Sequence, residues 1–88
     1  GGENNMLDNL RQLLDKHARL PVKAATLGSD QDLYAAGLTS FAAVQLMLAL
    51  EEAFDIEFPE RMLNRRSFAT MDSIAACISE LRPQALAS

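Results

Sequence analysis

The sequence predicts a small all-α protein, a bundle of four helical segments. Apolar residues recur at helical spacing in three stretches of the chain, and no alternating pattern typical of a strand is sustained. The chain has 88 residues, of which 49% are hydrophobic, so we expect a single domain with one modest core. A long loop between the first and second helices and a short third helix complete the predicted architecture.

The first helix is predicted over residues 6–17, and Leu20-Pro21 follows it as a stop signal. Several leucines repeat there at helical spacing: Leu7, Leu10, Leu13 and Leu14. Residues 1–5 are expected to be a disordered N-terminus, with Gly1-Gly2 as a remnant of a tag.

The long loop is predicted over residues 21–39, around the turn-forming cluster Gly28-Ser29-Asp30. A loop of this length needs anchors in the core. Its spaced apolar side chains are the candidates: Leu27, Leu33, Tyr34 and Leu38.

The second helix is predicted over residues 40–54 and is apolar almost all round. One stripe is the expected core face: Ala43, Leu46, Met47, Leu50 and Phe54. A second stripe consists of Phe41, Val44 and Leu48. We expect the long loop to cover Phe41 at least partly, whereas Leu48 is the better candidate for an exposed partner contact.

Pro59 is expected to start the short third helix over residues 60–63. The last helix is predicted over residues 71–81, where Arg82-Pro83 ends it. Residues 83–88 are then expected to form a frayed tail.

Ser40 is the strongest candidate for a functional residue. Gly37 can take the positive φ that ends the preceding segment, and Thr39 and Ser40 are both good N-cap residues. A serine hydroxyl at the positive end of a helix is well placed to carry a phosphate ester. The alternative is that Ser40 is only an N-cap, which would stabilise the helix by about 1 kcal/mol.

Composition excludes several classes of function. The formal net charge of −4 argues against a nucleic-acid partner, and no apolar run is long enough to span a membrane. A single cysteine, Cys77, cannot form an internal disulfide, which fits a reducing compartment. Because no signal peptide is visible either, we expect a cytoplasmic protein. We also expect a monomer. His17 is the only histidine, and no metal site or catalytic pair can be assembled around it.

Two segments of the chain carry a family resemblance. The first is Asp32-Leu33 followed by Gly37-Leu38-Thr39-Ser40-Phe41, and the second is Leu50-Glu51-Glu52-Ala53-Phe54 followed by Ile56-Glu57-Phe58-Pro59. Together they resemble the acyl and peptidyl carrier proteins over nearly the whole chain. The resemblance implies a four-helix bundle of acyl-carrier-protein type, with the carrier domain over residues 6–82.

This resemblance also implies a function. Ser40 would bind the cofactor, receiving 4′-phosphopantetheine from coenzyme A through a phosphopantetheinyl transferase. The protein would catalyse nothing itself, because the terminal thiol of the arm would be the reactive centre that holds an acyl group as a thioester.

Two departures from the family pattern bear on partners. Thr39 replaces the Asp that commonly precedes the serine and aids the transferase. Acidic residues are also missing from the first turns of the second helix, where only Glu51 and Glu52 remain. We therefore expect docking by apolar contact, with these partner-contact residues: Phe41, Val44, Leu48, Glu51 and Glu52.

The run from residue 32 to residue 68 is most similar to small stand-alone bacterial aminoacyl carrier proteins. Their partner is an amino acid:[carrier protein] ligase related to seryl-tRNA synthetase, which activates a small amino acid with ATP. The resemblance suggests glycine or alanine as cargo for an unknown downstream enzyme. The alternatives are an acyl carrier of fatty-acid, lipid or polyketide synthesis, and a plain interaction module without a cofactor.

Overall fold

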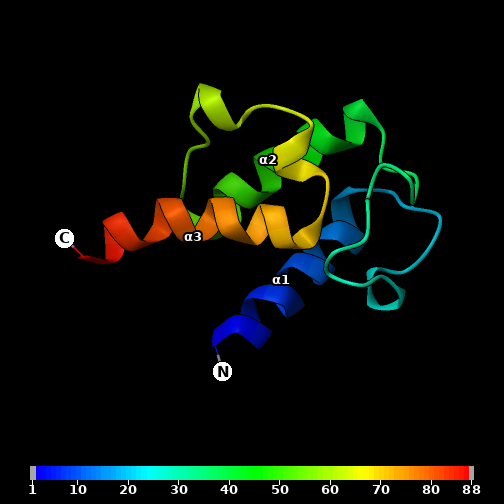
Figure 1. Cartoon of the computed structure of the whole chain (residues 1–88), viewed down its shortest axis with the longest axis horizontal. Coiled ribbons are helices and arrows are strands. Elements are labelled where there is room, and N and C mark those ends of the chain that lie inside the picture. The colour runs from blue at the N-terminus through cyan, green and yellow to red at the C-terminus, as the bar shows by residue number, and fades with distance from the viewer. Residues whose placement is uncertain (1, 88) are drawn as a thin grey trace.

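The computed structural model describes the backbone of residues 2–87 and the side chains of residues 6–82. Within this range the chain is helical without strands (Figure 1). Its elements, in order, are α1 (Gly2–His17), η1 (Ala24–Thr26), α2 (Ser40–Phe54), η2 (Glu60–Met62), η3 (Arg66–Phe68) and α3 (Met71–Ala87), where η marks a single 3-10 turn. The predicted all-α class is confirmed.

The predicted count of four helices is not confirmed. The segment expected to form the short third helix is the 3-10 turn η2, in which Met62 donates to the Pro59 carbonyl at 2.9 Å. η2 ends at Met62, and beyond it the Asn64 side-chain amide donates to the Arg61 carbonyl at 2.9 Å, a bond that competes with helical continuation. The described residues therefore contain three α-helices and three short turns.

Two helix boundaries also differ from the prediction. α1 begins at Gly2 rather than at residue 6, and α3 continues to Ala87 rather than ending at Pro83. Pro83 lacks the N–H that would bond to the carbonyl four residues earlier, so the helix passes this point with one hydrogen bond fewer. Residues 1 and 88, included in the predicted disordered N-terminus and frayed tail, lie outside the described residues.

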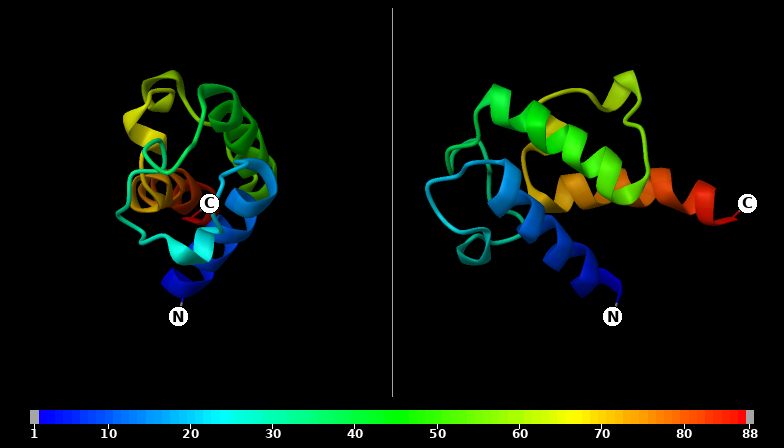
Figure 2. Two further views of the ribbon diagram at one scale, coloured as in Figure 1. Left: turned by 90° about the vertical axis from the view of Figure 1, so that its right-hand side faces the viewer. Right: turned by 180° about the vertical axis from the view of Figure 1, so that it is seen from behind.

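The core lies between the three α-helices, where α1 contacts both α2 and α3 (Figure 2). Its most deeply buried side chains are at most 1% exposed and include much of the predicted core: Leu10, Leu14, Leu33, Leu46, Leu50, Met71, Ile74 and Ile78. Burial of this apolar surface is the main stabilising term of so small a domain. No helix within the described residues is long and apolar enough to cross a membrane.

The connection between α1 and α2 is held to the bundle at both ends. Arg11 of α1 donates to the Ala24 and Leu27 carbonyls at 3.3 and 3.0 Å, and Asp15 accepts from the Ala24 N–H at 2.8 Å. Further along, the Leu33 N–H donates to the Ala69 carbonyl at 2.7 Å. This last bond brings the segment before α2 alongside the segment before α3.

Candidate functional site

Ser40 is the first residue of α2, and its hydroxyl is free for chemistry. The N-cap is Thr39, whose Oγ1 accepts from the Ala42 N–H at 3.0 Å. The side chain of Ser40 is exposed, and its Oγ makes no hydrogen bond to any described residue. The interpretation of Ser40 as the N-cap is therefore wrong, because Thr39 satisfies the helix end.

The turn before α2 depends on Gly37. This residue has φ of 121°, a conformation that L side chains rarely adopt, and a Cβ there would lie 2.7 Å from Cδ of Pro21. Its N–H donates to the Tyr34 carbonyl at 3.1 Å, while Leu38 donates to Leu33 at 2.9 Å. The tight turn buries Leu38 and leaves Ser40 at the surface.

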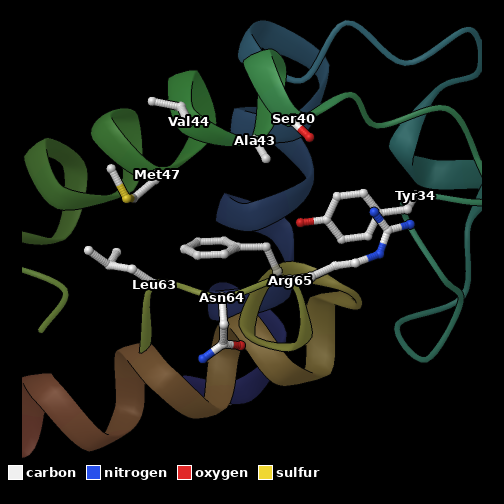
Figure 3. A pocket seen from close by; sticks show the side chains of 9 residues that line it. Tyr34, Ser40, Ala43, Val44, Met47, Leu63, Asn64 and Arg65 are labelled. Atoms are coloured by element: carbon white, nitrogen blue, oxygen red, sulfur yellow. The ribbon is translucent and has the colours of Figure 1, made fainter. Parts of the chain in front are cut away.

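A groove of about 280 Å³ opens beside Ser40. Val44 and Met47 of α2 form one wall, and Leu63 faces them from the connection between η2 and η3 (Figure 3). The buried residues Ala43 and Phe68 also line it, and Tyr34, Asn64 and Arg65 complete it. The groove is therefore apolar along its walls and polar close to Ser40.

Arg65 and Tyr34 form a stacked pair in this groove. The Arg65 guanidinium carbon lies 3.9 Å from the centroid of the Tyr34 ring, and Figure 3 shows the two groups face to face near Ser40. Burial raises the pKa of the Tyr34 hydroxyl, the Arg65 charge partly offsets this, and Asp32 raises the pKa further. Tyr34 is therefore a neutral phenol at physiological pH.

The second apolar stripe of α2 faces solvent. The exposed fractions are 67% for Phe41, 49% for Val44 and 50% for Leu48, and Leu63 adjoins them at 49%. The expectation that the loop covers Phe41 is wrong, because that loop packs against α1 and the segment before α3 instead. Together Phe41, Val44, Leu48 and Leu63 form what we call the apolar face.

The two glutamates predicted as partner contacts differ in their surroundings. Oε2 of Glu51 accepts from the Phe58 N–H at 2.9 Å, so this half-buried carboxylate helps to shape the chain after α2. Glu52 is exposed. Both remain predicted contacts, and Glu52 has the more accessible charge.

Sequence reasoning missed much of the groove. From the sequence, Tyr34 is expected only to anchor the loop. Arg65 and Arg66, in the polar run 64–67, are ordinary surface charges by default, and contact with the phosphate arm or with an acidic partner patch is the weaker alternative. Neither Tyr34 nor Arg65 carries a local signal for a site, because only packing brings them beside Ser40. Among the described residues, no three potential metal ligands come together.

Comparison with known proteins identifies the family. The model of the family described as "Phosphopantetheine attachment site" matches residues 9–78. The chain belongs to this family. The expected resemblance to carrier proteins is thus confirmed, and the cofactor of the domain is covalently attached 4′-phosphopantetheine.

Individual relatives are carrier proteins. An aminoacyl carrier protein of Agrobacterium fabrum is 57% identical over 65 residues, covering 74% of this chain and 78% of that protein. A D-alanyl carrier protein of Lactobacillus delbrueckii is 29% identical over 79 residues, covering 89% of this chain and 99% of that protein.

A solved structure supports the same fold. A carrier protein from Agrobacterium tumefaciens, in complex with an engineered Bradyrhizobium japonicum glycine:[carrier protein] ligase and AMP, superposes with a TM-score of 0.81. It is 51% identical, and the match covers 83% of this chain and 97% of that one. Carrier proteins are generally non-catalytic. The described residues fit a covalently held group, since the exposed Ser40 hydroxyl, which makes no hydrogen bond to them, adjoins a groove lined by the Arg65 guanidinium.

Proposed function

We propose that Ser40 carries the 4′-phosphopantetheine arm and that the domain is a carrier of a small aminoacyl group. An ATP-dependent amino acid:[carrier protein] ligase would load it, and a downstream enzyme would accept the cargo. A phosphopantetheinyl transferase would install the arm from coenzyme A. When attached, the arm supplies a terminal thiol that holds the acyl group as a thioester.

The observation that carries this proposal is the division of roles between two neighbouring hydroxyls. Thr39 caps α2, so Ser40 can be modified without loss of the helix cap. The first turn of α2 also favours negative charge, because its backbone N–H groups point toward the helix end. A phosphodiester on Ser40 would therefore lie in a favourable field.

A small cargo is supported by the relatives and by the groove. The relatives described above are named for aminoacyl and D-alanyl carriers, and the A. tumefaciens protein is bound to a glycine ligase. The groove of about 280 Å³ is slightly smaller than typical ligand pockets, which span roughly 300–1,000 Å³. We infer glycine or alanine as the cargo, whereas a long acyl chain would need a larger cavity.

The apolar face supports a ligase that docks mainly through hydrophobic contact. The first turn of α2 has no acidic residue, and Glu51 is engaged with the Phe58 N–H. Exposed apolar side chains that cluster on one face of a monomer are typical of a binding surface. We infer that Phe41, Val44 and Leu48 contact the ligase, with Glu52 at the edge.

The proposal is tested by measuring the intact mass of the protein isolated from its native cells under mildly acidic conditions that preserve thioesters. We expect a mass increase of one phosphopantetheine plus a small amino acid, mapped to Ser40. Ser40→Ala should abolish the increase, whereas Ser79→Ala, at another exposed serine, should retain it.

The other outcomes discriminate between the alternatives. A fatty or polyketide chain on the arm would favour the acyl carrier of lipid or polyketide synthesis. Persistence of the arm in Ser40→Ala would contradict the assignment of the attachment site.

A further inference from the structure

We propose that Arg65 is a positioning residue that binds the phosphodiester of the arm, and that Tyr34 holds the Arg65 guanidinium in place for this contact. The inference rests on the proposed attachment at Ser40. It assigns a function to a stacked pair that lies beside the attachment residue and that no local sequence motif marks.

The geometry of the groove carries the first step. Ser40 and Arg65 line the same groove although they lie far apart in the sequence, and Figure 3 shows the Ser40 hydroxyl directed toward the stacked pair. A group attached to Ser40 Oγ therefore leaves the helix next to the guanidinium. A phosphodiester carries a negative charge that an arginine fork can bind through its N–H donors.

Stacking carries the second step. The Arg65 guanidinium carbon lies 3.9 Å from the Tyr34 ring centroid, so one face of the guanidinium packs against the ring. The N–H donors point outward in the guanidinium plane and stay available for an anion. The stacked orientation also reduces the rotamer entropy that an exposed arginine loses when it binds a ligand.

Charge carries the third step. Arg65 has no carboxylate within salt-bridge distance among the described residues, whereas the nearby Arg61 is paired with Glu80. The acid that faces Tyr34 is Asp32, whose Oδ1 accepts from the Tyr34 and Ala35 N–H groups at 2.9 and 3.4 Å. Arg65 is thus a cation whose charge is not neutralised by a direct ion pair in this part of the fold.

The consequence is a bias in the direction of the arm. With its phosphate at Arg65, the arm would run along the groove between Met47 and Leu63 rather than out over Phe41. Because Arg65 is exposed, its contact with the phosphate is weak. Loss of this contact should reduce the fraction of molecules with the arm in the groove about fivefold rather than abolish it.

NMR spectroscopy of apo and holo protein tests this role. Holo protein is made from coenzyme A and a transferase, and its intact mass is measured first to verify loading. We expect loading to shift the Tyr34 amide and Arg65 Nε resonances, and to broaden the arm's phosphorus signal relative to free phosphopantetheine. Arg65→Gln should reduce the Tyr34 amide shift, and Arg65→Gln and Tyr34→Leu should both reduce the phosphorus broadening.

Arg66→Gln is the matched control, because Arg66 is the adjacent exposed arginine and does not line the groove. Arg66→Gln should retain the wild-type changes in shift and phosphorus linewidth on loading. Arg65→Lys should show only part of these changes. The positioning role is contradicted if Arg65→Gln leaves the shifts and the phosphorus broadening caused by loading unchanged, or if Arg66→Gln reduces them equally. A wild-type protein that gains no mass would instead overturn the attachment itself, before any spectrum is compared.

Discussion

Thr39 and Ser40 should respond in opposite ways to the loss of their hydroxyls. Thr39→Ala removes the oxygen that accepts from the Ala42 N–H at 3.0 Å, and loss of an N-cap costs about 1 kcal/mol. For a domain of this size, 1 kcal/mol corresponds to a fall in Tm of roughly 4–8 °C. Ser40→Ala removes a hydroxyl that bonds to no described residue, so its Tm should stay close to that of the wild type.

The assay combines thermal unfolding followed by circular dichroism with intact mass after incubation with coenzyme A and a transferase. We expect Thr39→Ala to lose stability and still accept the arm, and Ser40→Ala to keep stability and accept none. Thr39→Asp is the matched control, because aspartate is also a good N-cap and its charge is favoured at the start of a helix. It should retain the stability of the wild type and be modified at least as fast.

The reasoning would be refuted by the reverse pattern. If Ser40→Ala lowered Tm as much as Thr39→Ala, the cap would be shared, and modification would disturb the helix. If Thr39→Ala left Tm unchanged, the hydrogen bond to Ala42 would contribute nothing to stability.

Three further predictions follow from the site. Leu48→Glu should weaken ligase binding at least tenfold in calorimetry, because a charge in an apolar contact costs more than about 1.4 kcal/mol. Its Tm should stay within a few degrees of the wild type, because the Leu48 side chain is 50% exposed. Unchanged affinity would exclude Leu48 from the interface. The chain has a single tyrosine, so tyrosinate absorbance reports Tyr34 alone, and Arg65→Gln should raise the Tyr34 pKa further because the cation that favours the phenolate is gone. A Tyr34 pKa raised in the folded state contributes stability that is present below its ordinary value of about 10 and is lost as pH rises through the folded value, and alkaline unfolding curves check this sign. Gly37→Ala should cost about 1–3 kcal/mol in urea unfolding, because φ of 121° strains any L residue and the new Cβ would meet Pro21 at 2.7 Å; a neutral result would show that the turn can rearrange.

Local sequence patterns were sufficient to predict the helices whose apolar residues have a strong helical period. The second helix was predicted over residues 40–54 and is observed as Ser40–Phe54, and the first helix ends at His17 as expected. These boundaries depend on capping residues and on hydrogen bonds four residues apart, which are visible in sequence. The prediction of a short third helix failed because the few residues after Pro59 are compatible with both an α-helix and a single 3-10 turn.

Patterns were less reliable where a side chain has several possible neighbours. The loop was expected to cover Phe41, yet Arg11 donates to its Ala24 carbonyl and Asp15 accepts from its Ala24 N–H. These bonds hold the first part of the loop against α1, and Phe41 remains 67% exposed. Pro83 was expected to end α3, but the helix continues through it to Ala87 without the hydrogen bond that an N–H at this position would make.

The sequence by itself determined the helical class, the start of α2 and the candidacy of Ser40, because each depends on contacts within a few residues. The sequence left open which of two neighbouring hydroxyls caps the helix, and the structure shows that it is Thr39. Only the tertiary structure decided that Tyr34 and Arg65 lie beside Ser40. The hydrogen bond from Leu33 to the Ala69 carbonyl joins those segments across the fold. Such long-range contacts depend on how the whole core packs, which no local periodicity specifies.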